Sequence, residues 1–181
     1  GGTYWTIVHL YRWLSATNLV VGSSQGEELE SPEMPDDFMK AHSNIQAKFG
    51  STELMAFEAN LKHRKEVALE YDSVLNSLGK TTPNQPEYAE HIFLKYPVRV
   101  RNRDDFMAKA EKSKVRLGDW FNSPLHPIQG DLSPWNYEIG MCPIAEKLAA
   151  EVLNFPTDPD LSKDELSRVK KFLTDNANYL L

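Results

Sequence analysis

The segment from Leu117 to Pro127 carries the residue types best suited to bind a small polar molecule. It places Trp120, Ser123 and His126 in a loop that follows an expected strand. Aromatic walls with a few polar groups are what a polar ligand with one flat face needs. A purely structural interpretation also fits, in which Trp120 and Phe121 lie in the core and His126 is a surface residue. The pattern leaves both open, and Trp120, Ser123 and His126 are our candidate substrate-binding residues.

Signatures for several other kinds of chemistry do not occur in the sequence. It has no Gly-rich phosphate loop of the P-loop or dinucleotide-binding type and no HExxH pair. The five histidines are not at metal-ligand spacing, so we expect no metal site. The single cysteine, Cys142, can form neither an internal disulfide nor a CxxC site. A chain with one thiol suits a reducing compartment, and we expect the cytoplasm.

Composition and charge indicate a globular protein that does not bind nucleic acids or anionic membranes. Of the 181 residues, 41% are hydrophobic and 25% are charged, as in ordinary soluble domains. The net charge of -6 repels phosphate backbones and anionic lipids, so we expect neither a nucleic-acid nor a membrane partner. A local basic stretch of Arg99, Arg101 and Arg103 has the charge to hold an anion, or is simply a solvated strand end.

The N-terminal half of the sequence reads as helices separated by a linker. Residues 4–21 are apolar but interrupted by polar side chains, which predicts an amphipathic helix that packs on something outside this chain. Residues 22–37 have no apolar period and read as a linker. A short helix is expected from an N-cap at Asp36 to Gly50. A long helix then runs from Ser51 or Thr52 to a stop at Gly79, with one apolar stripe: Leu54, Phe57, Leu61, Ala68, Tyr71, Leu75 and Leu78.

The C-terminal half alternates strands and helices. Strands are expected at 91–101, where Pro97 favours an edge or a bulge, and at 115–121. Helices are expected from Asn102 to about Ser113 and from Pro143 through Val152, with a short extended piece at 154–156. A capping box at Ser162–Glu165 starts the last helix. This order predicts an α+β fold with a small sheet covered by helices, and a division into residues 1–35 and residues 36–181.

Several segments together resemble the DegT/StrS family of pyridoxal-phosphate (PLP) dependent sugar aminotransferases. They are His42-Ser-Asn-Ile-Gln-Ala-Lys-Phe-Gly50, then His63-Arg64 and Tyr71, Tyr96-Pro-Val-Arg-Val, Gly118 to His126, and Cys142-Pro-Ile-Ala-Glu to Pro156. The resemblance spans about residues 36–175 and implies the small C-terminal domain of the aspartate aminotransferase fold (fold type I). It also implies a homodimer that uses PLP to move an amino group from glutamate to a keto sugar, usually nucleotide-linked.

The resemblance also assigns site residues. His126 matches the family's "PLH" histidine, which lies near the substrate sugar, and Trp120 and Ser123 come next. The family's asparagine that reaches the cofactor phosphate is missing from the stretch Met39-Lys-Ala-His42. Lys40 is our candidate cofactor-binding residue there, with a solvated helix residue as the alternative. Asp158 stands where many members have histidine.

The catalytic lysine is the main gap in the resemblance. No lysine of this chain lies in a matching motif, and the segment that carries it is expected upstream of Gly1. We therefore expect the chain alone neither to bind PLP nor to transaminate. Two alternatives remain: a non-catalytic dimerisation or regulatory protein that retains only the small domain, and a membrane-surface protein that uses residues 4–21. The sugar, the nucleotide and the pathway stay open, and a few relatives dehydrate sugars instead.

Overall fold

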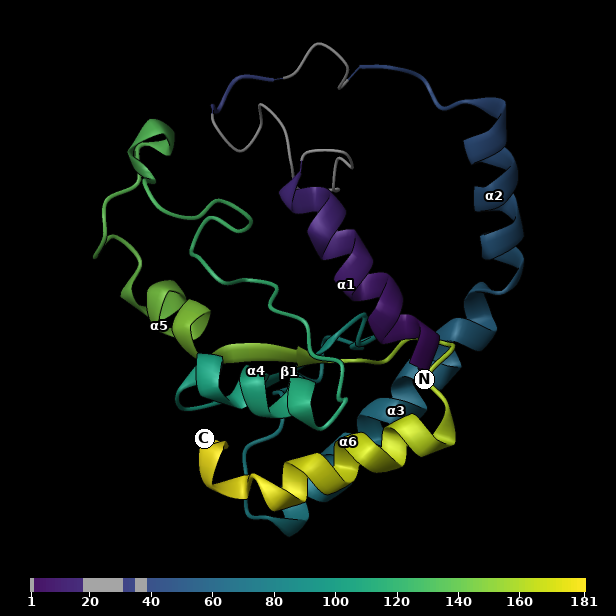
Figure 1. Ribbon diagram of the computed structural model, residues 1–181, viewed down its shortest axis with the longest axis vertical. Coiled ribbons are helices and arrows are strands. Elements are labelled where there is room, and N and C mark those ends of the chain that lie inside the picture. The colour runs from purple at the N-terminus through teal and green to yellow at the C-terminus, as the bar shows by residue number, and fades with distance from the viewer. Residues whose placement is uncertain (1, 18–30, 35–38) are drawn as a thin grey trace.

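The structure is a computed structural model, and it describes residues 2–17, 31–34 and 39–181. These residues form an α+β fold with a small sheet and helices around it (Figure 1), as the sequence predicts. The elements are α1 (Gly2–Ala16), α2 (Asn44–Met55), α3 (Phe57–Ser77), β1 (Tyr96–Arg99), α4 (Arg103–Lys112), η2 (Ser133–Trp135), α5 (Pro143–Glu151), β2 (Val152–Phe155), α6 (Lys163–Asp175) and η3 (Ala177–Tyr179).

The sheet consists of β1 and β2, paired antiparallel so that Tyr96 lies opposite Phe155. Pro97 therefore lies on an edge strand of the described sheet, as predicted. The predicted strand 91–101 is too long, because Phe93 has a left-handed backbone with φ of 50° and interrupts the extended run. The predicted strand 115–121 is wrong: only Gly118 forms a bridge, to Asn154, and Phe121 is again left-handed with φ of 64°.

Aromatic side chains fill the core between α3, the sheet, α4 and α6. The rings of Tyr71 and Tyr96 lie 5.1 Å apart, and those of Phe106 and Phe172 lie 5.0 Å apart in an edge-to-face arrangement. Phe155 contacts both groups from β2. Such ring pairs add about 0.5–1.5 kcal/mol beyond the burial of their area. The sheet is small, so these aromatic contacts supply much of the attraction between the layers.

Helix α3 packs on the core with part of its apolar stripe, and the N-terminal part of that stripe is exposed. The buried residues of α3 are Val67, Ala68, Tyr71, Val74 and Leu75. Leu54 and Phe57, which the sequence pattern places on the same stripe, are 71% and 47% exposed. The helix ends as predicted, because Gly79 is left-handed with φ of 65° and the N–H of Lys80 donates to the carbonyl of Leu75.

The predicted helix end at Gly50 is wrong. Helix α2 starts with a capping box between Ser43 and Gln46 and runs through Gly50 to Met55, and Ala56 separates it from α3. The hydroxyls of Ser51 and Thr52, expected to start a new helix, donate instead to carbonyls one turn back, Ala47 and Lys48. A predicted N-cap at Asp36 lies outside the described residues.

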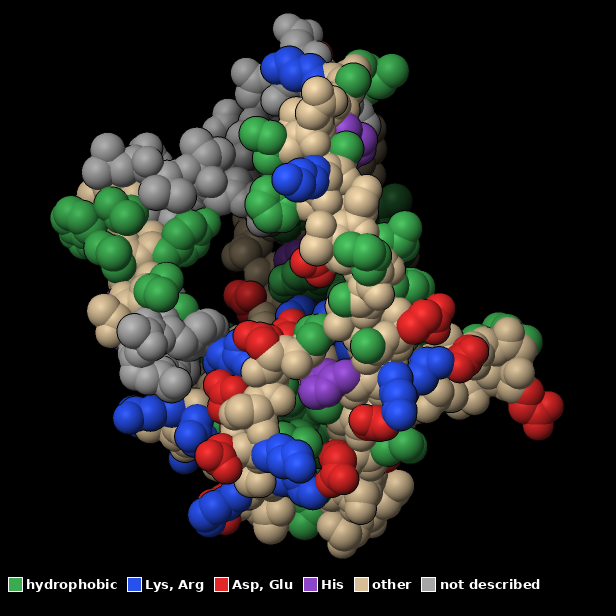
Figure 2. Space-filling view, turned by 90° about the vertical axis from the view of Figure 1, so that its right-hand side faces the viewer, with side chains coloured by type: hydrophobic (Ala, Val, Ile, Leu, Met, Phe, Trp, Pro, Cys, Tyr) green, Lys and Arg blue, Asp and Glu red, His purple; other side chains and the backbone are tan. Residues whose placement is uncertain are grey.

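The predicted N-terminal helix is present as α1, whereas residues 18–21 and most of the linker 22–37 lie outside the described residues. Ile7, Leu10 and Trp13 of α1 are 63%, 54% and 61% exposed. Figure 2, which faces α2, shows hydrophobic side chains on the surface over that helix as well. Helices α1 and α2 therefore leave apolar faces uncovered in this chain.

The last two helices begin where the sequence predicts. Pro143 is at the first turn of α5, and Ser162 forms a capping box with Glu165 at the start of α6. Val152 is not the end of the α5 stripe but the first residue of β2, which extends the predicted short strand toward its N-terminus. The stripe of α5 is not buried either: Ile144 is 75% exposed, and Ala149 is the buried residue of this helix.

Tyr71 joins α3 to the end of β2 by a buried hydrogen bond. Its hydroxyl donates to the carbonyl oxygen of Pro156 over 2.8 Å, and the side chain is fully buried. Burial raises the pKa of Tyr71 far above its ordinary value, so the hydroxyl remains a donor over the whole working range of pH. Because the acceptor is buried too, its loss of a partner would be costly.

We predict that Tyr71→Phe lowers the free energy of unfolding by about 1–3 kcal/mol, the cost of leaving a buried acceptor unpaired. Urea denaturation followed by circular dichroism measures the change. The matched control is Tyr88→Phe, because Tyr88 is 91% exposed and should leave stability unchanged. Equal stabilities of the two variants would show that the Tyr71 hydroxyl does not hold α3 to β2.

Candidate functional site

The loop that carries the candidate residues is attached to β2 through Asn154. The backbone N–H of Gly118 donates to the carbonyl of Asn154 over 2.8 Å, and the N–H of Asn154 donates back over 2.9 Å. The side-chain amide of Asn154 then donates to the carbonyl of Trp120 over 3.2 Å. A Cβ on Gly118 would lie 3.4 Å from the Cβ of Asn154, so a small residue suits this close approach.

A second contact ties the same loop to α4. The Nη2 group of Arg103, the first residue of α4, donates to the carbonyl of Asp119 over 2.9 Å. The side chain of Asn102 caps α4 by accepting the N–H of Asp105, as the sequence predicts. The start of α4 and the strand β2 therefore position the loop from two sides.

Trp120 is a surface residue that faces a lysine. It is 44% exposed and Phe121 is 57% exposed, so the interpretation that puts both in the core is wrong. The Nζ of Lys95 lies 5.7 Å from the centre of the Trp120 ring and 3.4 Å from Oδ1 of Asp158. A cation is attracted to the face of an indole ring, so Lys95 helps to fix the orientation of the Trp120 ring. Asp158, the departure from the family pattern, thus holds the lysine that faces Trp120.

His126 is oriented by Asn122, four residues before it in the chain. Its Nδ1 lies 3.0 Å from Oδ1 of Asn122, and its ring centre lies 5.5 Å from that of Phe121. An amide oxygen accepts only, so the proton of the neutral imidazole belongs on Nδ1. This arrangement leaves the Nε2 of His126 as an acceptor for a hydroxyl or amine of a bound molecule.

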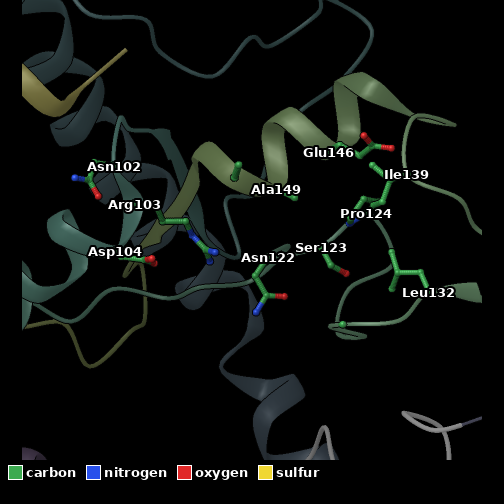
Figure 3. A pocket seen from close by; sticks show the side chains of 12 residues that line it. Asn102, Arg103, Asp104, Asn122, Ser123, Pro124, Leu132, Ile139, Glu146 and Ala149 are labelled. Carbon is green, nitrogen blue, oxygen red and sulfur yellow. The ribbon is translucent and has the colours of Figure 1, made fainter.

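The candidate residues line two neighbouring cavities. Trp120 and His126 line a cavity of about 420 Å³, and Ser123 lines another of about 570 Å³ (Figure 3). Asn122 lines both cavities. The structure therefore brings Trp120 and His126 together and places Ser123 in the adjacent space. Sequence reasoning missed Asn122, whose spacing of four residues from His126 was its only signal.

Lys40 lies apart from these cavities. It is exposed, precedes the Ser43 cap of α2, and lines neither cavity. No hydrogen bond or ion pair of its side chain is formed with the described residues. Its assignment to a cofactor phosphate stays a prediction.

The two cavities that contain the candidate residues offer no side chain that could hold PLP covalently. No lysine lines either cavity, whereas a PLP enzyme needs one to form the Schiff base. Lys95, which approaches Trp120, is paired with Asp158. Within residues 2–17, 31–34 and 39–181, no cluster of three or more His, Cys, Asp and Glu side chains has the geometry to hold a metal ion. No helix of that part of the chain is long and apolar enough to cross a bilayer.

Comparison with known proteins identifies relatives of one family. Residues 40–174 match the model of the DegT/DnrJ/EryC1/StrS aminotransferase family. The chain is 27% identical over 124 residues to a "Pleiotropic regulatory protein" of Geobacillus stearothermophilus. This match covers 67% of the chain and 33% of that protein. It is 27% identical over 133 residues to the UDP-2-acetamido-2-deoxy-3-oxo-D-glucuronate aminotransferase of Pseudomonas aeruginosa, covering 72% of this chain and 35% of the enzyme.

Solved structures of the same family share the fold. The structure of S. venezuelae DesV with a ketimine intermediate superposes with a TM-score of 0.64 at 20% identity, over 79% of this chain and 40% of that one. A DegT/DnrJ/EryC1/StrS aminotransferase from Brucella abortus superposes with a TM-score of 0.61 at 20% identity, over 77% and 40%. The chain thus spans about a third of the length of the curated relatives and belongs to the DegT/DnrJ/EryC1/StrS aminotransferase family.

Proposed function

We propose that this chain is the substrate-facing C-terminal part of a PLP-dependent transaminase that transfers an amino group from glutamate to a nucleotide-linked keto sugar. The observation that carries the proposal is the cavity lined by the exposed Trp120 and by His126, within the segment that matches the family. A relative from Pseudomonas aeruginosa is named as an aminotransferase of a UDP-linked keto sugar. The cytoplasm is the compartment that we propose for this reaction.

The site residues have distinct tasks in this proposal. The half-exposed ring of Trp120 offers a flat apolar face for a sugar, and Lys95 keeps that ring in place. The Nε2 of His126 accepts a hydrogen bond from a substrate hydroxyl, while Asn122 fixes the ring from the Nδ1 side. PLP would supply the electron sink from another part of the enzyme, where its lysine lies, and Lys40 is our candidate contact to its phosphate.

The exposed apolar faces fit an assembly larger than this chain. Helices α1 and α2 expose Leu10, Trp13, Phe49 and Leu54 by more than half of their surface. Exposed apolar patches of this kind are typical of surfaces that bind another protein or another domain. We propose that they pack on the cofactor-binding part of the enzyme or on a second copy in a homodimer.

A non-catalytic regulatory role is the second candidate. It is favoured by the Geobacillus relative that is named as a regulatory protein. In this case the apolar faces of α1 and α2 would bind a regulatory partner. Turnover by the complete polypeptide separates the two candidates.

We predict that the isolated 181-residue chain does not convert a UDP-linked keto sugar in the presence of PLP and glutamate. The complete polypeptide that contains the chain should form both the amino sugar and 2-oxoglutarate in the same assay, because the lysine is then present. Product is measured by mass spectrometry. Turnover by the isolated chain would contradict the assignment of the lysine to another segment, and no turnover by the complete polypeptide would favour the regulatory role.

In the complete polypeptide, we predict that His126→Ala lowers kcat/KM for the keto sugar by about ten- to a hundredfold. This is the loss expected for one hydrogen bond to a polar or charged partner. Steady-state kinetics with the sugar as the varied substrate measures it. The control is His91→Ala, since His91 is exposed and lines neither cavity. Unchanged kinetics of His126→Ala would remove this residue from the site.

A further inference from the structure

The larger cavity beside the site loop has features that the transaminase proposal does not use. It has a volume of about 570 Å³ and lies between the start of α4, helix α5 and the loop that follows Asn122 (Figure 3). Its volume falls within the range of small-molecule sites in proteins, roughly 300–1,000 Å³. Arg103, Asn122, Ser123, Asp104 and Glu146 supply its polar lining.

Arg103 has hydrogen-bonding capacity that the protein does not satisfy. One of its N–H groups donates to the carbonyl of Asp119. Its Nε is buried and has no hydrogen-bond partner within the described residues, and its guanidinium forms no ion pair with them. A buried donor without a hydrogen-bond partner destabilises the protein, and more so when the group is charged. A carboxylate is the group that a guanidinium binds best, because its two oxygens match the N–H fork.

The side chains of Asn122 and Ser123 also have hydrogen-bond donors without an acceptor among the described residues. The Oδ1 of Asn122 is taken by the Nδ1 of His126, which leaves the amide N–H groups of Asn122 available. The Oγ of Ser123 accepts the backbone N–H of Leu125, which leaves its hydroxyl hydrogen available. Figure 3 shows Arg103, Asn122 and Ser123 arranged around the same space. Asn122 and Ser123 thus retain donors, and Arg103 retains N–H groups beyond the one that it donates to Asp119.

The acidic residues at the ends of the cavity restrict what can bind there. Asp104 is exposed at the start of α4, and Glu146 accepts hydrogen bonds from the Tyr137 hydroxyl and the Gly140 N–H. These two contacts hold the pKa of Glu146 below its ordinary value, the Gly140 N–H contributing most. The lowered pKa keeps Glu146 anionic at neutral pH. The carboxylates of Asp104 and Glu146 repel a multiply charged anion and accept hydrogen bonds from hydroxyl groups.

The lining of the cavity also has an apolar part. Leu132 and Ala149 are buried apolar residues of the lining, and they suit the C–H groups of a small ring. We propose that this cavity binds a hydroxylated carboxylic acid, with its single carboxylate on Arg103, Asn122 and Ser123 and its hydroxyl groups toward Asp104 and Glu146. The proposal concerns binding alone and does not require the transaminase activity.

The test is a titration of the 15N-labelled 181-residue chain, followed by the NMR resonance of the Arg103 Nε–H. Four probes are compared: D-glucuronate, L-glutamate, D-glucose and inorganic phosphate, at constant ionic strength. Glucuronate and glucose differ in the carboxylate alone, and glutamate carries carboxylates without sugar hydroxyls. We expect glucuronate to shift the Arg103 resonance with a dissociation constant at least tenfold below that of glucose, as for a charge-assisted hydrogen bond.

Variants separate the site from non-specific binding. Arg103→Gln should weaken glucuronate binding about ten- to a hundredfold, measured by calorimetry, whereas Arg101→Gln, at an exposed arginine nearby, should leave it unchanged. Because Arg103 also holds the loop through Asp119, Ser123→Ala is the second variant, and it should weaken binding about three- to tenfold.

The outcomes are distinct. Binding of glucuronate that depends on Arg103 and Ser123 supports the proposal, whereas equally tight binding of glutamate contradicts the assignment of hydroxyl groups to Asp104 and Glu146. The proposal is overturned if neither carboxylate shifts the Arg103 resonance, if glucose binds as tightly as glucuronate, or if phosphate binds and the carboxylates do not. None of these results depends on turnover, so a failure here leaves the transaminase proposal to its own test.

Discussion

The structure depends on one buried polar residue, Asn154, at the junction between the sheet and the site loop. It is only 3% exposed, so each of its polar groups needs a partner within the protein. Its backbone pairs with Gly118 on the side of β2 away from β1, and its side-chain amide donates to the carbonyl of Trp120. The loop with the candidate residues is thus held by the strand at the centre of the core.

The core in turn fixes the far end of β2. The Tyr71 hydroxyl binds the carbonyl of Pro156, and the hydroxyl of Thr157 donates to the carbonyl of Phe93 over 2.7 Å and accepts from Arg64 over 2.9 Å. These buried contacts hold α3, the end of β2 and the segment before β1 in one arrangement. Lys95 follows directly in that segment, so the same contacts determine where its cation meets Trp120. Scaffold and site are therefore continuous.

Local signals in the sequence predict much of this architecture, whereas long-range contacts limit the rest. The cap at Ser162, the proline at the start of α5 and the glycine after α3 are predicted correctly, because each acts within a few residues. Gly50 misleads, since a glycine inside a helix has the same local pattern as a glycine at its end. The equivalent cap at Ser43 has a local signal too, Gln46 three positions on, which the sequence analysis does not use.

The site is predicted less completely, for a physical reason. Trp120 and His126 do line one cavity, yet their partner Lys95 carries no distinguishing pattern in the sequence, and Asn122 carries only its spacing from His126. In the sequence, Arg103 stands out only as part of a basic stretch. The burial of its Nε without a partner follows from the packing of α4, the loop and α5 around the cavity. Contacts between segments that are distant in the chain create these features, and no local period encodes them.

The most direct test of this account is hydrogen exchange of the Asn154→Ala variant. The substitution removes the amide donor to Trp120 and leaves the backbone bridge to Gly118 possible. The account predicts that amides from Gly118 to His126 exchange about tenfold faster than in the parent chain, as for the loss of one hydrogen bond, while α3 and α6 keep their protection. Unchanged exchange in the loop, or an equal increase throughout α3, α6 and the loop, would contradict the claim that Asn154 couples the core to the site.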